Sequence, residues 1–304
     1  MNRLILLVIV SVAFACNSTA EKEIVSEQSN DTLKTIIKPE VKFNPLDHVP
    51  DDRNEIVSNL QQKIDQKQPL VVHCLAPLCD NDNQGIVPTT ESLGDGFSLR
   101  TNLYWATSYG MKKYFVKNKS WKHLEVTNFI ASDTIMERVA FEQSYENGAS
   151  VILICDAYRG DMMAPCVYDF LNALAGNLRD SINYKDGFLQ IGQEADMMAF
   201  NGHNGLMDVY ADTIYAKSKR IKDAVVIACS SKSYFNPYFV QTNSYPLLNT
   251  TSLLWPGAMI LEAVIEKWAL LRPDEEIEHA AGDAYHDVKE CGRQSARNMF
   301  SSGW

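Results

Sequence analysis

A histidine and a cysteine stand where two apolar segments of the chain end. Residues 195–200 lead into Asn201-Gly202-His203-Asn204-Gly205, and residues 223–228 lead directly into Cys229. A thiol attacks a carbonyl as the thiolate, and an imidazole that titrates near neutral pH is its usual proton acceptor. Glycines beside the histidine let backbone N–H groups turn toward a developing oxyanion. These residue types therefore indicate cysteine-dependent acyl transfer.

The elements that must position these two residues follow from the apolar pattern. Continuous apolar runs of strand length are typical of strands buried on both faces, and they occur at 69–76, 150–156, 195–200 and 223–228. A further strand is expected at 121–129, and helices are expected at 55–66, 103–116, 132–147, 162–178, 208–219, 258–271 and 275–300. This alternation predicts an α/β fold, a three-layer sandwich with a mainly parallel sheet.

The spacing of the two candidate residues fits that fold. His203 precedes Cys229 by 26 residues, which is room for one helix and one strand. We therefore expect them on neighbouring parallel strands, at the carboxyl edge where such sheets bind ligands. In an unrelated doubly wound fold the two would lie too far apart to share a substrate.

The order of these features resembles the caspase-like cysteine peptidases, the clan that includes caspases, legumains, gingipains, clostripain and separase. Residues 228–235 read Ala-Cys-Ser-Ser-Lys-Ser-Tyr-Phe, similar to the legumain form Ala-Cys-x-Ser-Gly-Ser followed by an apolar residue. Gly202-His203 is similar to the Gly-His-Gly of separase and clostripain, with Asn204 where the family has glycine. The resemblance covers about residues 69–235.

The resemblance implies a caspase-like fold and a peptidase with a Cys-His dyad that needs no cofactor. Cys229 would attack the peptide carbonyl and form an acyl-enzyme, and His203 would protonate the leaving amine and then activate water. The backbone N–H of Cys229, with that of Asn204 or Gly205, would hold the oxyanion. The same edge carries candidates for a pocket that receives a substrate side chain: Asp156, Arg159 and Asp161.

The loop after the first strand contains a near match to a calcium-binding pattern. Asp80, Asp82 and Glu91 follow the spacing D-x-[DN]-x-[DN]-G-x₅-E, but Gln84 breaks the fifth position. The alternatives are an Asx-rich loop with turn-forming Asn and Asp, or a wall of the active site. In the preceding strand, His73 is expected as a core histidine.

The pattern of the first fifty residues is typical of an export and anchoring segment. Residues 1–15 resemble a lipoprotein signal peptide, with an apolar run at 4–14 that is too short to span a bilayer. Ala-Phe-Ala-Cys at 13–16 resembles a lipobox and implies lipidation of Cys16, with plain secretion as the alternative. Residues 16–50 are predicted to be a flexible tether and 51–304 the caspase-like domain. The expected location is a bacterial cell envelope, lipid-anchored to a membrane.

Composition limits the partners. The chain of 304 residues has 28 Lys+Arg, 38 Asp+Glu and a net charge of −10, which argues against nucleic-acid binding. It contains no P-loop, no HExxH and no G-x-S-x-G. The expected partners are a peptide or protein substrate and, through the N-terminal lipid, a membrane. The alternative to a hydrolase is a non-catalytic envelope lipoprotein that uses the same fold as a binding or assembly module.

Overall fold

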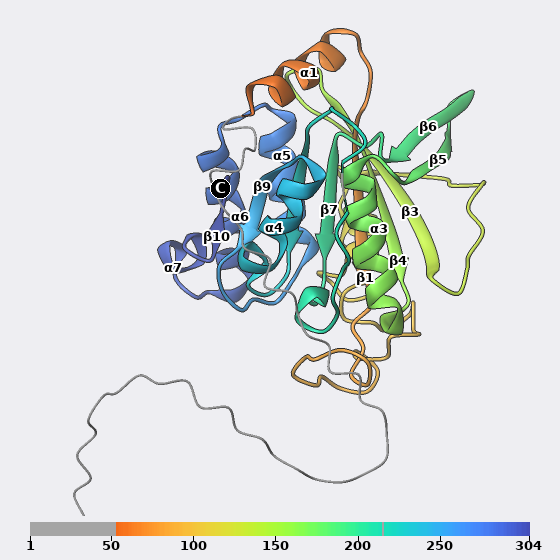
Figure 1. Ribbon diagram of the computed structural model, residues 1–304, viewed down its shortest axis with the longest axis vertical. Coiled ribbons are helices and arrows are strands. Elements are labelled where there is room, and N and C mark those ends of the chain that lie inside the picture. The colour runs from red at the N-terminus through yellow and green to blue at the C-terminus, as the bar shows by residue number, and fades with distance from the viewer. Residues whose placement is uncertain (1–52, 215) are drawn as a thin grey trace, which may run out of the picture. The chain divides into compact units, whose positions relative to one another are not determined.

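The structure, a computed structural model, describes residues 53–214 and 216–304 (Figure 1). These residues fall within one unit of contacts, Glu40–Trp304. The expected signal peptide at 1–15, the tether at 16–50 and the lipidation site Cys16 lie outside the described residues. Among the described residues, no helix is both long and apolar enough to cross a membrane.

An eight-stranded sheet in the order β10-β9-β8-β7-β1-β4-β3-β2 forms the middle layer. Its strands are β1 (Leu70–Pro77), β2 (Lys122–Leu124), β3 (Ile135–Ser144), β4 (Ser150–Tyr158), β7 (Met197–Asn201), β8 (Lys222–Ile227), β9 (Ser244–Thr250) and β10 (Phe300–Ser301). The five strands from β9 to β4 are parallel, and β10, β3 and β2 pair antiparallel at the edges. Every residue of β1, β7 and β8 is buried, as their apolar runs require.

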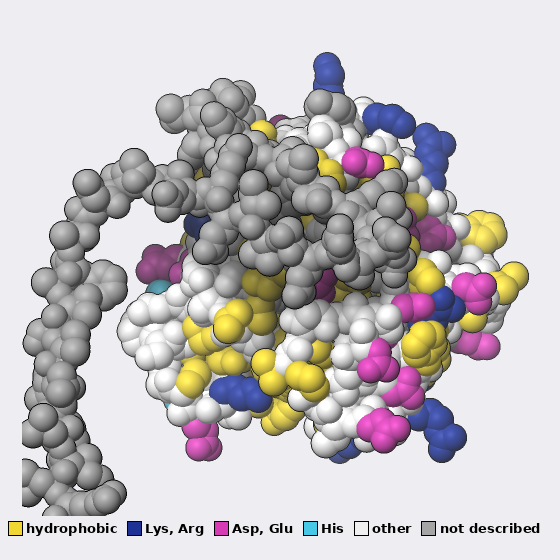
Figure 2. All heavy atoms as spheres, turned by 60° about the horizontal axis from the view of Figure 1, so that its bottom comes forward, with side chains coloured by type: hydrophobic (Ala, Val, Ile, Leu, Met, Phe, Trp, Pro, Cys, Tyr) yellow, Lys and Arg dark blue, Asp and Glu magenta, His cyan; other side chains and the backbone are white. Residues whose placement is uncertain are grey.

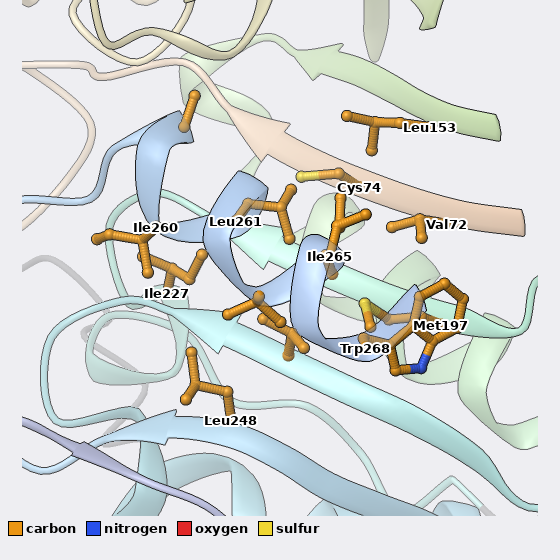
Figure 3. Packing of buried hydrophobic residues seen from close by; sticks show 14 of the residues in the cluster. Val72, Cys74, Leu153, Met197, Ile227, Leu248, Ile260, Leu261, Ile265 and Trp268 are labelled. Carbon is orange, nitrogen blue, oxygen red and sulfur yellow. The ribbon is translucent and has the colours of Figure 1, made fainter. Parts of the chain in front are cut away.

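Helices cover both faces of the sheet. They are α1 (Asn54–Asp65), α2 (Met111–Lys117), α3 (Met163–Ala175), α4 (Ser231–Thr242), α5 (Ala258–Ala269), α6 (Asp274–Lys289) and α7 (Arg293–Arg297). Residues of α3 and α4 belong to one buried cluster, and residues of α1, α2, α5, α6 and α7 to the other. On the face covered by α5, the side chains of Leu261, Ile265 and Trp268 pack over the central strands of the sheet (Figure 3). The α/β sandwich with a mainly parallel sheet is therefore as the sequence predicts.

The strand order creates a switch point at the carboxyl edge. β4 lies on one side of β1, and the next parallel strand along the chain, β7, lies on the other. The loops that follow β1 and β7 therefore leave the sheet side by side, at the position where open α/β sheets bind ligands. A separate hairpin, β5 (Arg179–Tyr184) and β6 (Gly187–Gly192), lies outside the main sheet (Figure 1).

Two predicted helices are wrong. Within 132–147 the chain forms β3, which pairs with β4 from Ile135↔Tyr158 to Ser144↔Ser150. The backbone groups on the open side of β4 need partners, and this pairing outweighs the helical propensity of the segment. At 208–219 the described residues form an irregular loop, preceded by a single 3-10 turn, η2 (Gly205–Met207). The elements α4 and β9 were not expected, and the helix predicted at 275–300 ends at Lys289.

Candidate active site

The pairing of β7 with β8 brings the candidate histidine and cysteine to adjacent strand ends. The register runs from Met197↔Asp223 to Asn201↔Ile227, so two further residues on each strand lead to His203 and Cys229. Beyond the ladder, the side chain of Asn204 donates from Nδ2 to the backbone oxygen of Cys229 at 2.7 Å. The two ends are thus joined directly, one residue after the histidine.

Cys229 lies on the turn between β8 and α4. The next residue, Ser230, has φ 47° and ψ 35°, the left-handed conformation that costs a non-glycine residue roughly 1–2 kcal/mol. α4 begins at Ser231, so the half-buried thiol lies near a helix N-terminus. Here the thiol donates a hydrogen bond from Sγ to the backbone oxygen of Leu254 at 3.4 Å.

The imidazole of His203 is held by a carboxylate that sequence reasoning missed. Nε2 of His203 lies 2.7 Å from Oδ2 of Asp208, and the imidazole is only 5% exposed. Because a carboxylate only accepts, Nε2 carries the proton of this bond, and Nδ1 keeps its lone pair in the neutral ring. Asp208 was expected in a helix. The sequence signal that could have identified Asp208 is an acidic residue five positions after the histidine.

Asn204 and Gly205, the predicted oxyanion residues, both have structural roles. Asn204 is fully buried, and its Oδ1 caps η2 by accepting from the N–H of Leu206 at 3.1 Å. A Cβ at Gly205 would lie 2.5 Å from Sδ of Met163, so α3 packs directly on the glycine backbone. Their N–H groups as an oxyanion hole stay a prediction.

A second thiol and a phenol lie near this edge. Cys79 follows β1 and is buried, and burial raises the pKa of its thiol to about 11, with the hydrogen bond to Tyr104 opposing part of that rise. Burial also raises the pKa of the Tyr104 phenol well above its ordinary value. The six described cysteines are all free.

Asp156, predicted to line a substrate pocket, is fully buried instead. It lies inside β4, where Oδ2 bonds Nε2 of His73 at 2.9 Å and Oδ1 accepts from Nε of Arg138 at 2.6 Å. Burial alone would raise the pKa of the Asp156 carboxyl, but His73 and Arg138 hold it below its ordinary value. Arg138 also binds Asp180 and so ties the β5–β6 hairpin to the sheet. Asp156 therefore belongs to the core, like His73, and cannot line an open pocket.

Arg159 and Asp161 follow β4 and are paired with each other, with Asp161 in the 3-10 turn η1 (Gly160–Met162). Nε of Arg159 donates to Oδ1 of Asp161 at 2.6 Å, and its guanidinium lies 5.4 Å from the ring centre of Phe97. Phe97 also lines a cavity of about 620 Å³ formed by loop residues 80–101. Neither His203 nor Cys229 lines that cavity. The substrate-pocket role of Arg159 and Asp161 stays a prediction.

The near match to a calcium loop is an Asx-rich turn. Oδ1 of Asp80 accepts from the N–H groups of Asp82 and Asn83 at 2.9 and 3.0 Å, and Oδ2 accepts from the side chain of Asn83. Within 53–214 and 216–304, no group of three or more His, Cys, Asp or Glu side chains is arranged to hold a metal ion. The loop therefore shows no preformed cluster of three acidic ligands, and a calcium site at Asp80, Asp82 and Glu91 stays a prediction.

The face that carries this edge has a mixed surface. Figure 2 shows hydrophobic and acidic side chains interspersed over its described part, with Lys and Arg scattered between them. No family model, curated protein or solved structure matches the chain. The motifs and the geometry described above therefore carry the functional interpretation.

Proposed function

We propose that this chain is a caspase-like cysteine hydrolase that cleaves peptide bonds with Cys229 and His203. One observation carries the proposal: the register of β7 and β8 sets the two residues at adjacent strand ends, tied by the bond from Asn204 to Cys229. The left-handed turn at Ser230 and the start of α4 behind the thiol support it, because both are means of exposing and activating a nucleophile.

The reaction that these groups support begins with a proton transfer. The neutral imidazole of His203 accepts the thiol proton of Cys229 at Nδ1, and the thiolate adds to the substrate carbonyl carbon. The tetrahedral oxyanion collapses as the imidazolium gives its proton to the leaving amine, which yields a thioester. His203 then takes a proton from water, hydroxide adds to the thioester, and the thiol and a carboxylic acid are regenerated. The hydrogen bond from Sγ to Leu254 must break first.

Attachment to a bacterial envelope membrane through lipid on Cys16 is part of the proposal. It is supported by the sequence of residues 1–16 alone. Metabolic labelling with a radioactive fatty acid should mark the wild-type chain and leave Cys16→Ser unlabelled. Equal labelling of both would contradict lipidation at this residue.

The catalytic proposal is tested by alkylating the folded full chain with iodoacetamide at pH 6 and pH 8, followed by peptide mapping. Cys16→Ser is used as the background, which removes the lipid. Cys291 is exposed and serves as the unactivated reference thiol in the same molecule. Cys229 should react faster than Cys291 at pH 6 and lose that advantage in His203→Ala. Peptide substrates should be cleaved by the parent chain and not by Cys229→Ala. Full cleavage by a folded Cys229→Ala chain would refute the mechanism.

A non-catalytic binding module is favoured by two specific observations. The thiol of Cys229 already has an acceptor in Leu254, and the imidazole of His203 is almost fully buried. Both are typical of a packed strand end. If Cys229 reacts only after denaturation while Cys291 reacts in the folded chain, the binding module replaces the hydrolase.

A further inference from the structure

We infer that Asp208 is a positioning residue for His203, and that the loop after β1 fixes the position of the Asp208 carboxylate through a hydrogen bond from the backbone N–H of Gly85. The inference rests on the proposed function, because it assigns the residue that selects the base form of the imidazole. Two donors meet at one oxygen of Asp208. Oδ2 of Asp208 accepts from Nε2 of His203 at 2.7 Å and from the N–H of Gly85 at 2.9 Å.

The bond to Asp208 determines which nitrogen of His203 can act as a base. With the proton on Nε2, the neutral ring presents its lone pair at Nδ1; with the proton on Nδ1, that atom could only donate. The carboxylate of Asp208 accepts and never donates, so it favours the first form. The imidazole is 5% exposed and the Asp208 side chain 25% exposed, so water competes weakly for this bond.

Gly85 fits against Asp208 only because it has no side chain. A Cβ at this position would lie 2.6 Å from Oδ1 of Asp208, closer than real Cβ contacts. The neighbouring residue, Gln84, fixes the loop: its buried side chain donates from Nε2 to the backbone oxygens of Leu78 and Gly160 at 2.7 and 3.0 Å. The N–H of Gly85 is thereby held at the end of β1, the strand adjacent to β7.

Both candidate catalytic residues are held by one short segment, residues 204–208. At its start Asn204 binds the backbone of Cys229, and at its end Asp208 binds the imidazole of His203. η2 lies between them, and the N–H of Asp208 closes it by donating to the oxygen of Gly205 at 3.0 Å. The loop after β1 therefore contacts the site through the end of this segment, and a displacement of Gly85 changes the position of the imidazole.

The test measures the tautomer of His203 directly. The full chain carrying Cys16→Ser is labelled with ¹⁵N-histidine, and long-range ¹H–¹⁵N correlations distinguish the Nε2–H form from the Nδ1–H form. The chain has six histidines, and His203→Gln assigns the signal. The parent should show the Nε2–H form, and Asp208→Ala should show a mixture. Asp212→Ala, an exposed acid in the same loop, is the matched control and should leave the signal unchanged.

The contribution of the loop is tested with a pair of glycine variants. Gly85→Ala should disturb the tautomer as Asp208→Ala does, whereas Gly187→Ala should not, because a Cβ there meets no atom within 4 Å. Alkylation of Cys229 at pH 6 should fall roughly tenfold or more in Asp208→Ala. An unchanged tautomer in folded Asp208→Ala overturns the inference. A changed tautomer with no dependence of Cys229 alkylation on His203 instead overturns the proposed function and, with it, the catalytic role of Asp208.

Discussion

Replacing Asn204 by alanine should destabilise the fold and slow the reaction of Cys229 together. The side chain is fully buried and makes two hydrogen bonds to backbone groups. It donates to the oxygen of Cys229 at 2.7 Å and accepts from the N–H of Leu206 at 3.1 Å. Alanine leaves both groups without a partner in surroundings that water hardly reaches.

The expected size follows from the two orphaned groups. Each buried polar group left unpaired costs about 1–3 kcal/mol, so Asn204→Ala should lower the free energy of unfolding by about 2–6 kcal/mol. For a domain of this size the loss corresponds to a fall in Tm of roughly 4–24 °C. Asn204→Ser should cost about half as much, because serine still caps Leu206 but cannot reach Cys229.

Asn128 provides a matched control. This asparagine is exposed, yet it makes the same kind of pair: it donates to the oxygen of Ser181 at 3.0 Å and accepts from the N–H of Asn183 at 2.9 Å. Asn128→Ala should cost below about 1 kcal/mol, because water replaces both partners. Urea unfolding monitored by circular dichroism measures all three variants. Equal losses for Asn204→Ala and Asn128→Ala would refute the reasoning that burial sets the cost.

Three further predictions concern buried ionisable groups. Asp223 is fully buried and binds Arg53 through both oxygens at 2.8 Å, so Asp223→Ala should lower the free energy of unfolding by about 3–5 kcal/mol in urea titrations; a loss below 1 kcal/mol would contradict this. Burial lowers the pKa of Lys222 from 10.5 to about 8. Between pH 8 and pH 10.5 the unfolded chain therefore binds more protons than the folded chain, and the free energy of unfolding should rise with pH by up to about 3 kcal/mol. Lys222→Met should lack this rise. Because burial raises the pKa of Cys79 to about 11, iodoacetamide at pH 8 should alkylate Cys291 and spare Cys79, as peptide mapping would record.

The elements predicted correctly are those whose local sequence is compatible with only one type of secondary structure. β1 and β4 are continuous apolar runs, and such runs are stable in water only when both faces of the strand are covered. The helices at α3 and α5 likewise follow from their apolar pattern. β3 could not be predicted in this way. Its residues suit a helix, and only the unpaired backbone groups along β4 select a strand.

The residues of the candidate site were likewise predictable only in part. His203 and Cys229 were found from sequence because each ends an apolar strand, and strand ends are positions that a local pattern reveals. Asp156 follows the same rule but belongs to the core, because Arg138 on a strand that was expected to be a helix pairs with its carboxylate. Asp208 was missed because its segment, residues 208–219, was predicted to be a helix.

The sequence by itself determined the class of fold, the buried parallel strands and the two candidate residues at their ends, because burial of apolar runs is decided by side chains a few positions apart. Only the tertiary structure decided what those residues contact. The bond between Gly85 and Asp208 joins residues 123 positions apart, and the bond between His73 and Asp156 joins residues 83 apart. No local pattern encodes such pairs, since they exist only once the sheet has brought the strand ends together.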